Sequence, residues 1–196
     1  MSRGRRPGAP DTRAEILAAA RALFAARGFG NTSIRAIAAD AGVDSSLVHH
    51  YFGTKDDLFM AALQLPVDPR ELLAPVLANG PEGAAEAMLR IFLSVWDDPE
   101  NQLAFLGLFR SVLDPPGERL LSEGFVPVVL GPVGVALGID HPEVRLPLVA
   151  SQMIGLIMCR YVLRIEPLAS MEQGTLVAAY GPTIQRYLTG ELPLDP

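Results

Sequence analysis

The segment IRAIAADAGVDSSLVHHYF, residues 34–52, decides the fold. It holds two short stretches with apolar residues at helical spacing, and Gly42 separates them. Two short helices joined by a glycine-containing turn are the layout of a helix-turn-helix. In that motif the second helix enters the major groove of DNA, where each base pair presents a distinct pattern of hydrogen-bonding groups. The segment therefore predicts a DNA-binding unit.

The second predicted helix, 45–52, divides into an apolar and a polar side. We expect Val48 and Phe52 to pack inward. The short or planar polar side chains that remain outward suit base edges and phosphate oxygens: Ser45, Ser46, His49 and His50, with Tyr51 beside them. Lys55, the only lysine of the chain, follows in the first turn of the next predicted helix. A cation at a helix N-terminus opposes the helix dipole, which favours a phosphate within its reach.

The residues before this motif add positive charge. Residues 2–10, SRGRRPGAP, are too rich in Gly, Pro and Arg to fold and are predicted to form a flexible arm. Residues 1–60 carry eight basic and six acidic groups, a balance of +2, whereas 61–196 carry eight basic and 16 acidic groups, a balance of −8. Binding to an anion depends on the local field, so the net charge of −6 does not exclude DNA. The arm can lie in the minor groove or along the backbone, or it is an ordinary solvated tail.

The rest of the chain is predicted to be helical as well. Asp11 or Thr12 can cap a first helix that ends near Gly28, and a fourth helix should run over 55–65. Pro66 and Pro69 mark a boundary, after which helices are expected at 70–77, 81–96, 99–113, 142–165 and 171–188, with a turn at 114–117 and two or three broken pieces over 118–137. Strand patterns are absent. We predict an all-α protein with an arm (1–10), a helix-turn-helix domain (11–65) and a larger helical domain (66–196).

The helix expected at 142–165 is apolar around most of its circumference. Such a helix must be buried on most sides. Packing it and the helix at 171–189 against a second copy, across a two-fold axis, would achieve this. Alternatively, the other helices of the same chain already cover both.

Several classes of protein are disfavoured. An apolar content of 49% argues against disorder, and the single cysteine, Cys159, excludes a disulfide scaffold. The longest stretch without charge, 124–139, is shorter than the ~18 residues of a membrane span. With no signal peptide pattern, we expect a cytoplasmic protein.

Three histidines and one cysteine do not suggest a metal site, and no enzyme motif is present, so we expect no cofactor and no enzymatic activity. We expect Cys159 to be a buried thiol, although nearby Arg160 and Arg164 leave oxidation sensing open.

Residues 11–65 resemble the DNA-binding domain of the tetracycline-repressor (TetR) family of bacterial transcription regulators. The landmarks are RAEILAAARALF (13–24), Gly28-Phe29, TSI (32–34), IA (37–38), AGV (41–43), VHHYF (48–52), Thr54-Lys55 and Leu58. The family usually has an aromatic pair and a histidine before the phenylalanine, where this chain has His49, His50 and Tyr51. Residues 160–167 are similar to a stretch common in an actinobacterial subset. The resemblance implies homodimers joined through the last two long helices, with an effector cavity among the preceding helices.

We therefore expect a homodimeric transcription regulator that binds a palindromic double-stranded operator. It is most simply a repressor released by a small, apolar effector; an activator, or a ligand-binding protein that has lost DNA binding, are the alternatives. Base contacts are assigned to Ser45, Ser46, His49 and His50, phosphate contacts to Thr32, Ser33, Tyr51, Thr54 and Lys55, and backbone or minor-groove contacts to Arg3, Arg5 and Arg6. Effector contacts, each of which can instead be plain core, are assigned to Met88, Phe92, Trp96, Phe105, Phe109 and Met153.

Overall fold

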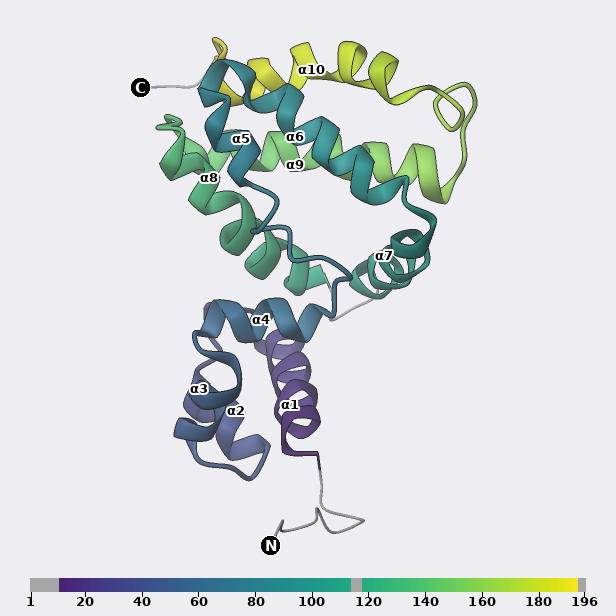
Figure 1. Ribbon diagram of the computed structural model, residues 1–196. Coiled ribbons are helices and arrows are strands. Elements are labelled where there is room, and N and C mark those ends of the chain that lie inside the picture. The colour runs from purple at the N-terminus through teal and green to yellow at the C-terminus, as the bar shows by residue number, and fades with distance from the viewer. Residues whose placement is uncertain (1–10, 114–117, 194–196) are drawn as a thin grey trace, which may run out of the picture. The chain divides into compact units, whose positions relative to one another are not determined.

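The computed structural model describes residues 11–113 and 118–193, without the side chains of 108–113 and 121 (Figure 1). Every regular element within these ranges is helical, which confirms the predicted all-α class. The chain forms two compact units. Of the described residues, the first unit contains 11–65, 112–113 and 118–124, and the second contains 66–111 and 125–193. The predicted arm, with Arg3, Arg5 and Arg6, and the predicted turn at 114–117 lie outside the described residues.

The first unit contains α1 (Thr12–Arg27), α2 (Ile34–Asp40), α3 (Ser45–Phe52) and α4 (Lys55–Leu63). Of the two possible caps of α1, Asp11 is the one used, since its carboxylate accepts a hydrogen bond from the backbone N–H of Ala14. At the other end Gly28 adopts a φ of 78°, a conformation that glycine reaches without strain.

Three phenylalanine rings form the centre of this unit. Phe24 and Phe29 stack at 5.7 Å, and Phe59 meets them edge-on at 5.3 and 5.1 Å. Ile37 and Leu58 are also fully buried. Each such side chain contributes roughly 1.5–3 kcal/mol on burial, so this cluster holds α1, α2 and α4 together.

The segment 118–124 packs on the end of α1 and on α4. Arg119 donates a hydrogen bond of 2.8 Å to the carbonyl of Ala26, and the Glu123 carboxylate occupies the space of a Cβ at Gly28. The Phe59 ring likewise leaves no room for a side chain at Gly124. The sequence-based limits of 11–65 and 66–196 assign this segment to the second domain, and these limits stay a prediction.

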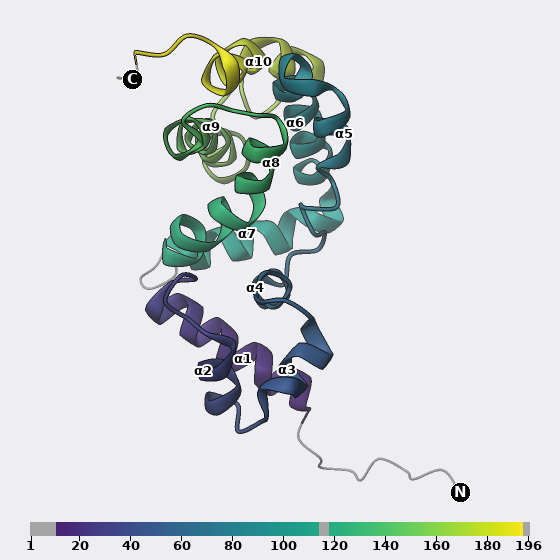
Figure 2. The same cartoon turned by 90° about the vertical axis from the view of Figure 1, so that its left-hand side faces the viewer.

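The second unit combines four long helices with three short elements: α5 (Ala74–Ala78), α6 (Gly80–Trp96), α7 (Pro99–Leu113), α8 (Gly131–Ala136), α9 (Pro142–Leu156), the π-helix η2 (Ile157–Val162) and α10 (Gln173–Thr189). Within it, α10 packs against α6 and α9 (Figure 2). Its core includes Leu89, Leu93, Leu156, Leu176 and Ile184. None of the described helices combines the length and apolarity needed to cross a bilayer.

Two expected elements differ from those observed. The helix predicted over 70–77 is reduced to α5, because the Asp68 side chain accepts from the backbone and guanidinium of Arg70 and holds a turn there. The two or three pieces predicted over 118–137 are two elements, the π-helix η1 (Leu120–Leu130) and α8, but they follow each other directly and Pro127 lies inside η1. The wider π-helix shifts the hydrogen bonds to the fifth residue, which relieves the clash that Pro127 would cause in an α-helix.

A buried cation joins the ends of α9 and α10. Arg145, whose side chain is 6% exposed, donates from Nη1 to the carbonyls of Tyr187 (3.0 Å) and Gly190 (2.9 Å). Its Nε lies 3.0 Å from an Asp140 oxygen, outside hydrogen-bond alignment, while Nη2 donates to the same carboxylate at 3.2 Å. The positive charge complements the carbonyl end of the α10 dipole.

Candidate DNA-binding surface

Local hydrogen bonds set the geometry of the helix-turn-helix. Ser33 caps α2 by accepting from the Ala36 N–H at 3.2 Å, and Gly42, with a φ of 67°, makes the turn. The Val43 N–H then donates to the Ala38 carbonyl. Asp44 caps α3 through a 2.8 Å hydrogen bond from the Ser46 N–H, and its hydrogen bonds with Ser46 lower the pKa of Asp44. The cap therefore stays ionised and suits the positive end of the α3 dipole.

The α3 helix separates its side chains as the sequence pattern predicts. Val48 and Phe52 are buried against the unit. Ser46, His49 and His50 are exposed, Tyr51 is 43% exposed and Ser45 is half-buried. The outward face of α3 is therefore polar and carries no carboxylate.

The two histidines of this face are held differently. The Nδ1 atom of His49 lies 2.8 Å from the carbonyl oxygen of Gly53. The ring of His50 instead meets the ring of Tyr51 edge-on, at 5.6 Å between centroids. Both rings are exposed, so each can meet a ligand of this face.

The proposed phosphate contacts Thr32 and Thr54 need correction. Thr32 is 1% exposed, and its hydroxyl lies 2.8 Å from the Gly28 carbonyl and 3.2 Å from the Leu23 carbonyl, so it ties the start of α2 to the end of α1. Thr54 is exposed, but its hydroxyl donates to Asp57 at 2.6 Å and accepts from the Asp57 N–H in a capping box of α4. In both threonines the hydroxyl proton, which a phosphate oxygen would have to accept, is already donated within the fold.

Ser33 and Lys55 remain compatible with a phosphate role. The Ser33 hydroxyl accepts a cap hydrogen bond with its oxygen, which leaves its proton for another acceptor. The Lys55 ammonium lies 4.2 Å from the centre of the Phe29 ring, and burial lowers the pKa of Lys55. Its position at the α4 N-terminus is thus explained in part by a cation–π contact, without a phosphate.

The structure shows two further basic side chains of the first unit that the sequence pattern does not assign to phosphate contacts. The guanidinium of Arg13, on α1, lies 5.1 Å above the ring of Phe52 at the end of α3. Arg35 is exposed on α2. Helical periodicity shows which face of α1 is apolar, but it cannot show that the start of α1 meets the end of α3.

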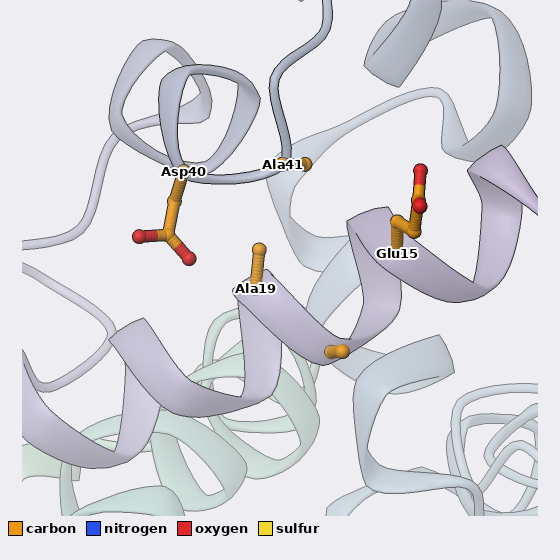
Figure 3. Close-up of a pocket in the computed structure, with 5 residues that line it drawn as sticks. Glu15, Ala19, Asp40 and Ala41 are labelled. Carbon is orange, nitrogen blue, oxygen red and sulfur yellow. The ribbon is translucent and has the colours of Figure 1, made fainter. Parts of the chain in front are cut away.

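A shallow hollow of about 410 Å³ lies elsewhere on the first unit, between α1 and the end of α2 (Figure 3). It is lined by Glu15, Ala18, Ala19, Asp40 and Ala41, and both carboxylates are exposed. Two carboxylates repel phosphate. The hollow therefore marks a part of this unit over which a DNA backbone is disfavoured.

The predicted effector contacts lie in the second unit and pack among themselves. Met88 is buried in the core, and Met153 is half-buried against it. Trp96 stacks on Phe105 at 5.0 Å and lies 5.8 Å from Phe92. The Phe109 side chain lies outside the described residues. This packing is compatible with a core role and leaves the effector role untested.

A polar cluster that sequence reasoning missed borders these aromatic residues. Asp97 accepts hydrogen bonds from Arg160 (3.2 Å), Tyr161 (2.9 Å) and Gln173 (2.9 Å), and Arg160 also donates to the Leu168 and Met171 carbonyls. Desolvation raises the pKa of Asp97, but the three hydrogen bonds and the Arg160 charge outweigh it and lower that pKa. The partners are more than 60 residues apart in the chain, which is why no local pattern reveals them.

Comparison with known proteins identifies the family. A model described as "Tetracyclin repressor-like, C-terminal domain" matches 82–188, more than half of the chain, and one described as "Bacterial regulatory proteins, tetR family" matches 16–62. A TetR-family regulator from Streptomyces coelicolor A3 is 40% identical over 94% of this chain and 98% of that one, with a TM-score of 0.45.

Two curated relatives match over part of the chain. The transcriptional regulator HbdR of Aromatoleum sp. (strain CIB) is 34% identical over 44% of this chain and 36% of its own length. The transcriptional repressor Rv3405c of Mycobacterium tuberculosis (strain ATCC 25618 / H37Rv) is 52% identical over 29% of this chain and 30% of its own length. The chain thus spans about a third of the length of these relatives. Because the C-terminal family model alone covers more than half of the chain and the N-terminal model covers the helix-turn-helix, the chain belongs to the TetR family of helix-turn-helix transcription regulators.

Proposed function

We propose that this regulator is a homodimeric repressor that binds a palindromic operator and is released from it by a small, largely apolar effector. The observation that carries the proposal is the outward face of α3, which is exposed, polar and free of carboxylates. Such a face suits the major groove. Base contacts would come from Ser45, Ser46, His49 and His50.

Phosphate contacts would come from residues around that face. Ser33, Tyr51 and Lys55 keep this role, and we add Arg13, whose guanidinium is exposed beside the end of α3. The arm residues Arg3, Arg5 and Arg6 would follow the backbone or the minor groove. Phosphate contacts fix the position of a protein on the duplex, whereas base contacts select the sequence.

The dimer would form through α9, η2 and α10. The outward positions of α10 include the small or ring-shaped residues Ala178, Ala179 and Pro182, which are exposed, while Ile154 and Met158 on the neighbouring elements are half-buried. An apolar surface with small side chains allows close packing of two helices across a two-fold axis. Such a dimer would have to place its recognition helices one DNA turn apart, about 34–36 Å.

The effector would bind in the second unit, near Trp96. Trp96 stacks on Phe105 and on Tyr161, so this region presents apolar aromatic side chains, and the Asp97 cluster lies next to it in the chain. An effector releases DNA only if it binds more tightly to a dimer geometry that does not fit the operator. Because Trp96 is the only tryptophan, its fluorescence should change on binding, and a panel in which only sugars or small cations stabilise the protein would contradict an apolar effector.

The DNA-binding part of the proposal is tested by selecting genomic fragments with the purified protein. The control is a variant that lacks residues 2–10 and carries Lys55→Ala. We expect a few palindromic sites that the variant recovers weakly or not at all, and a dimer by light scattering. If folded dimeric protein, free of any bound ligand by mass spectrometry, enriches no site at low salt, the proposal is wrong and the chain has lost DNA binding.

A further inference from the structure

The ring of His49 is fixed by the backbone that follows its helix. Its Nδ1 lies 2.8 Å from the Gly53 carbonyl oxygen, and the Gly53 N–H donates to the His49 carbonyl at 2.9 Å. Gly53 has a φ of 77° and a ψ of −108°, a backbone conformation that side-chain-bearing residues rarely adopt. The backbone of Gly53 thus makes two hydrogen bonds with His49, one with its main-chain carbonyl and one with its side chain.

This contact determines where the proton of the neutral ring lies. A carbonyl oxygen only accepts hydrogen bonds, so an Nδ1 at 2.8 Å from it must be the donor. A neutral imidazole carries one N–H, and its other nitrogen is then an acceptor. Neutral His49 is therefore the Nδ1–H tautomer, with Nε2 as an unprotonated nitrogen.

The residue that carries the acceptor nitrogen is exposed. His49 follows Ser45 by four residues and Ser46 by three, so its ring lies beside these two polar side chains, at the edge of the buried side formed by Val48 and Phe52. The ring is already held by Gly53, so less side-chain freedom is lost when it meets a ligand. His50, one position further, lacks this backbone contact and meets Tyr51 instead.

We propose that His49 reads an exocyclic amine of the operator, adenine N6 or cytosine N4, through its Nε2 acceptor. This inference rests on the proposed function, because it assumes that α3 enters the major groove. In that groove the amines of adenine and cytosine are the donors, whereas guanine O6 and N7 and thymine O4 accept. An acceptor at His49 therefore selects the amine bases and meets a second acceptor at guanine or thymine.

The tautomer is measured without DNA. A long-range proton–nitrogen correlation spectrum of the histidine side chains, at about pH 8, separates protonated from unprotonated ring nitrogens. The chain has three histidines, and the signal that disappears in His49→Asn belongs to His49. We expect a protonated Nδ1 and an unprotonated Nε2; the opposite tautomer would overturn the inference whatever the protein does with DNA.

The base contact is measured on the operator obtained by selection. In His49→Asn, the amide nitrogen can replace Nδ1 as donor to Gly53, but nothing replaces Nε2. We expect this variant to lose base preference at one position per half-site while the other positions stay selective. The matched control is His50→Asn, which should keep the preference at that position.

Base analogues then remove the amine alone. Replacing the adenine of one half-site by purine, or the cytosine by 2-pyrimidinone, should weaken wild-type binding by about 3- to 10-fold, the effect of one hydrogen bond. The same replacement should leave His49→Asn unaffected and weaken His50→Asn like the wild type. Equal wild-type affinity for both operators overturns the inference while the regulator still binds DNA. Absence of any selected site overturns the proposed function itself and this base contact with it.

Discussion

Replacing Thr32 with valine separates the structural role of this residue from a role in DNA binding. The hydroxyl is buried and lies within hydrogen-bond distance of the Gly28 and Leu23 carbonyls. Valine keeps the volume but loses the donor. A net hydrogen bond contributes about 1 kcal/mol, and a buried carbonyl left without its donor adds to that loss, so we expect a destabilisation of about 1–2 kcal/mol.

The assay is urea unfolding followed by far-ultraviolet circular dichroism. With a slope near 2 kcal/mol/M, a loss of about 1.5 kcal/mol lowers the unfolding midpoint by roughly 0.7 M. At low temperature and without urea, the variant stays folded and its DNA affinity should remain within about twofold of the wild type.

The neighbouring residue supplies the matched comparison. Ser33→Ala removes an exposed cap and a candidate phosphate contact, so it should weaken DNA binding as well as destabilise the fold, by about 1 kcal/mol. The reasoning is refuted if Thr32→Val unfolds at the wild-type urea concentration but binds DNA more weakly, because the hydroxyl would then face the duplex.

Substitutions at three further residues test other parts of the structure. Lys55→Ala should lower the slope of log affinity against log salt by about one unit, and Lys55→Arg should restore it; an unchanged slope in the alanine variant would restrict Lys55 to its contact with Phe29. The pKa of Asp97 is lowered in the folded protein, so its stabilisation is complete above its ordinary pKa of ~3.9 and is lost as the pH falls through the folded value. Acid titration of the unfolding free energy should therefore show a steeper loss below about pH 4 in the wild type than in Asp97→Asn, and parallel curves would argue against the cluster. Arg145→Met should destabilise the second unit by about 2–3 kcal/mol, because it removes a buried cation from two carbonyls; thermal unfolding within 1 °C of the wild type would contradict this.

The parts of the site that sequence predicts are those set by local periodicity and capping. The face of α3 and the turn at Gly42 depend on residues within four positions of each other, and a helical pattern places them correctly. Thr32 and Thr54 have the same chemistry as a phosphate ligand, but their hydroxyls are used within the fold. Sequence spacing cannot distinguish these two uses.

The parts that sequence misses depend on contacts between distant elements. Arg13 reaches the ring of Phe52 only because the start of α1 packs beside the end of α3. Asp97 looks like an ordinary acidic residue at a helix end until Arg160 and Gln173 fold onto it. The π-helix η1 is a similar case, since the proline rule that predicts a break applies to the α-helix and not to the wider helix that forms.

The recognition surface is stabilised by bonds within its own unit, which limits how an effector can act on it. Asp44 caps the start of α3, Gly53 closes its end, and Thr54 caps the next helix. The segment 118–124, which lies within the stretch matched by the C-terminal family model, contacts the end of α1 and α4 through Ala26, Gly28 and Phe59.

An effector that releases DNA should therefore move the first unit as a body without reshaping α3. We expect effector addition to shift the amide resonances of 118–124 and of the α1 end, and to leave those of 45–53 unchanged in DNA-free protein. Large shifts across 45–53 would mean that the caps open on effector binding, and the local bonds described above would then be too weak to hold the surface.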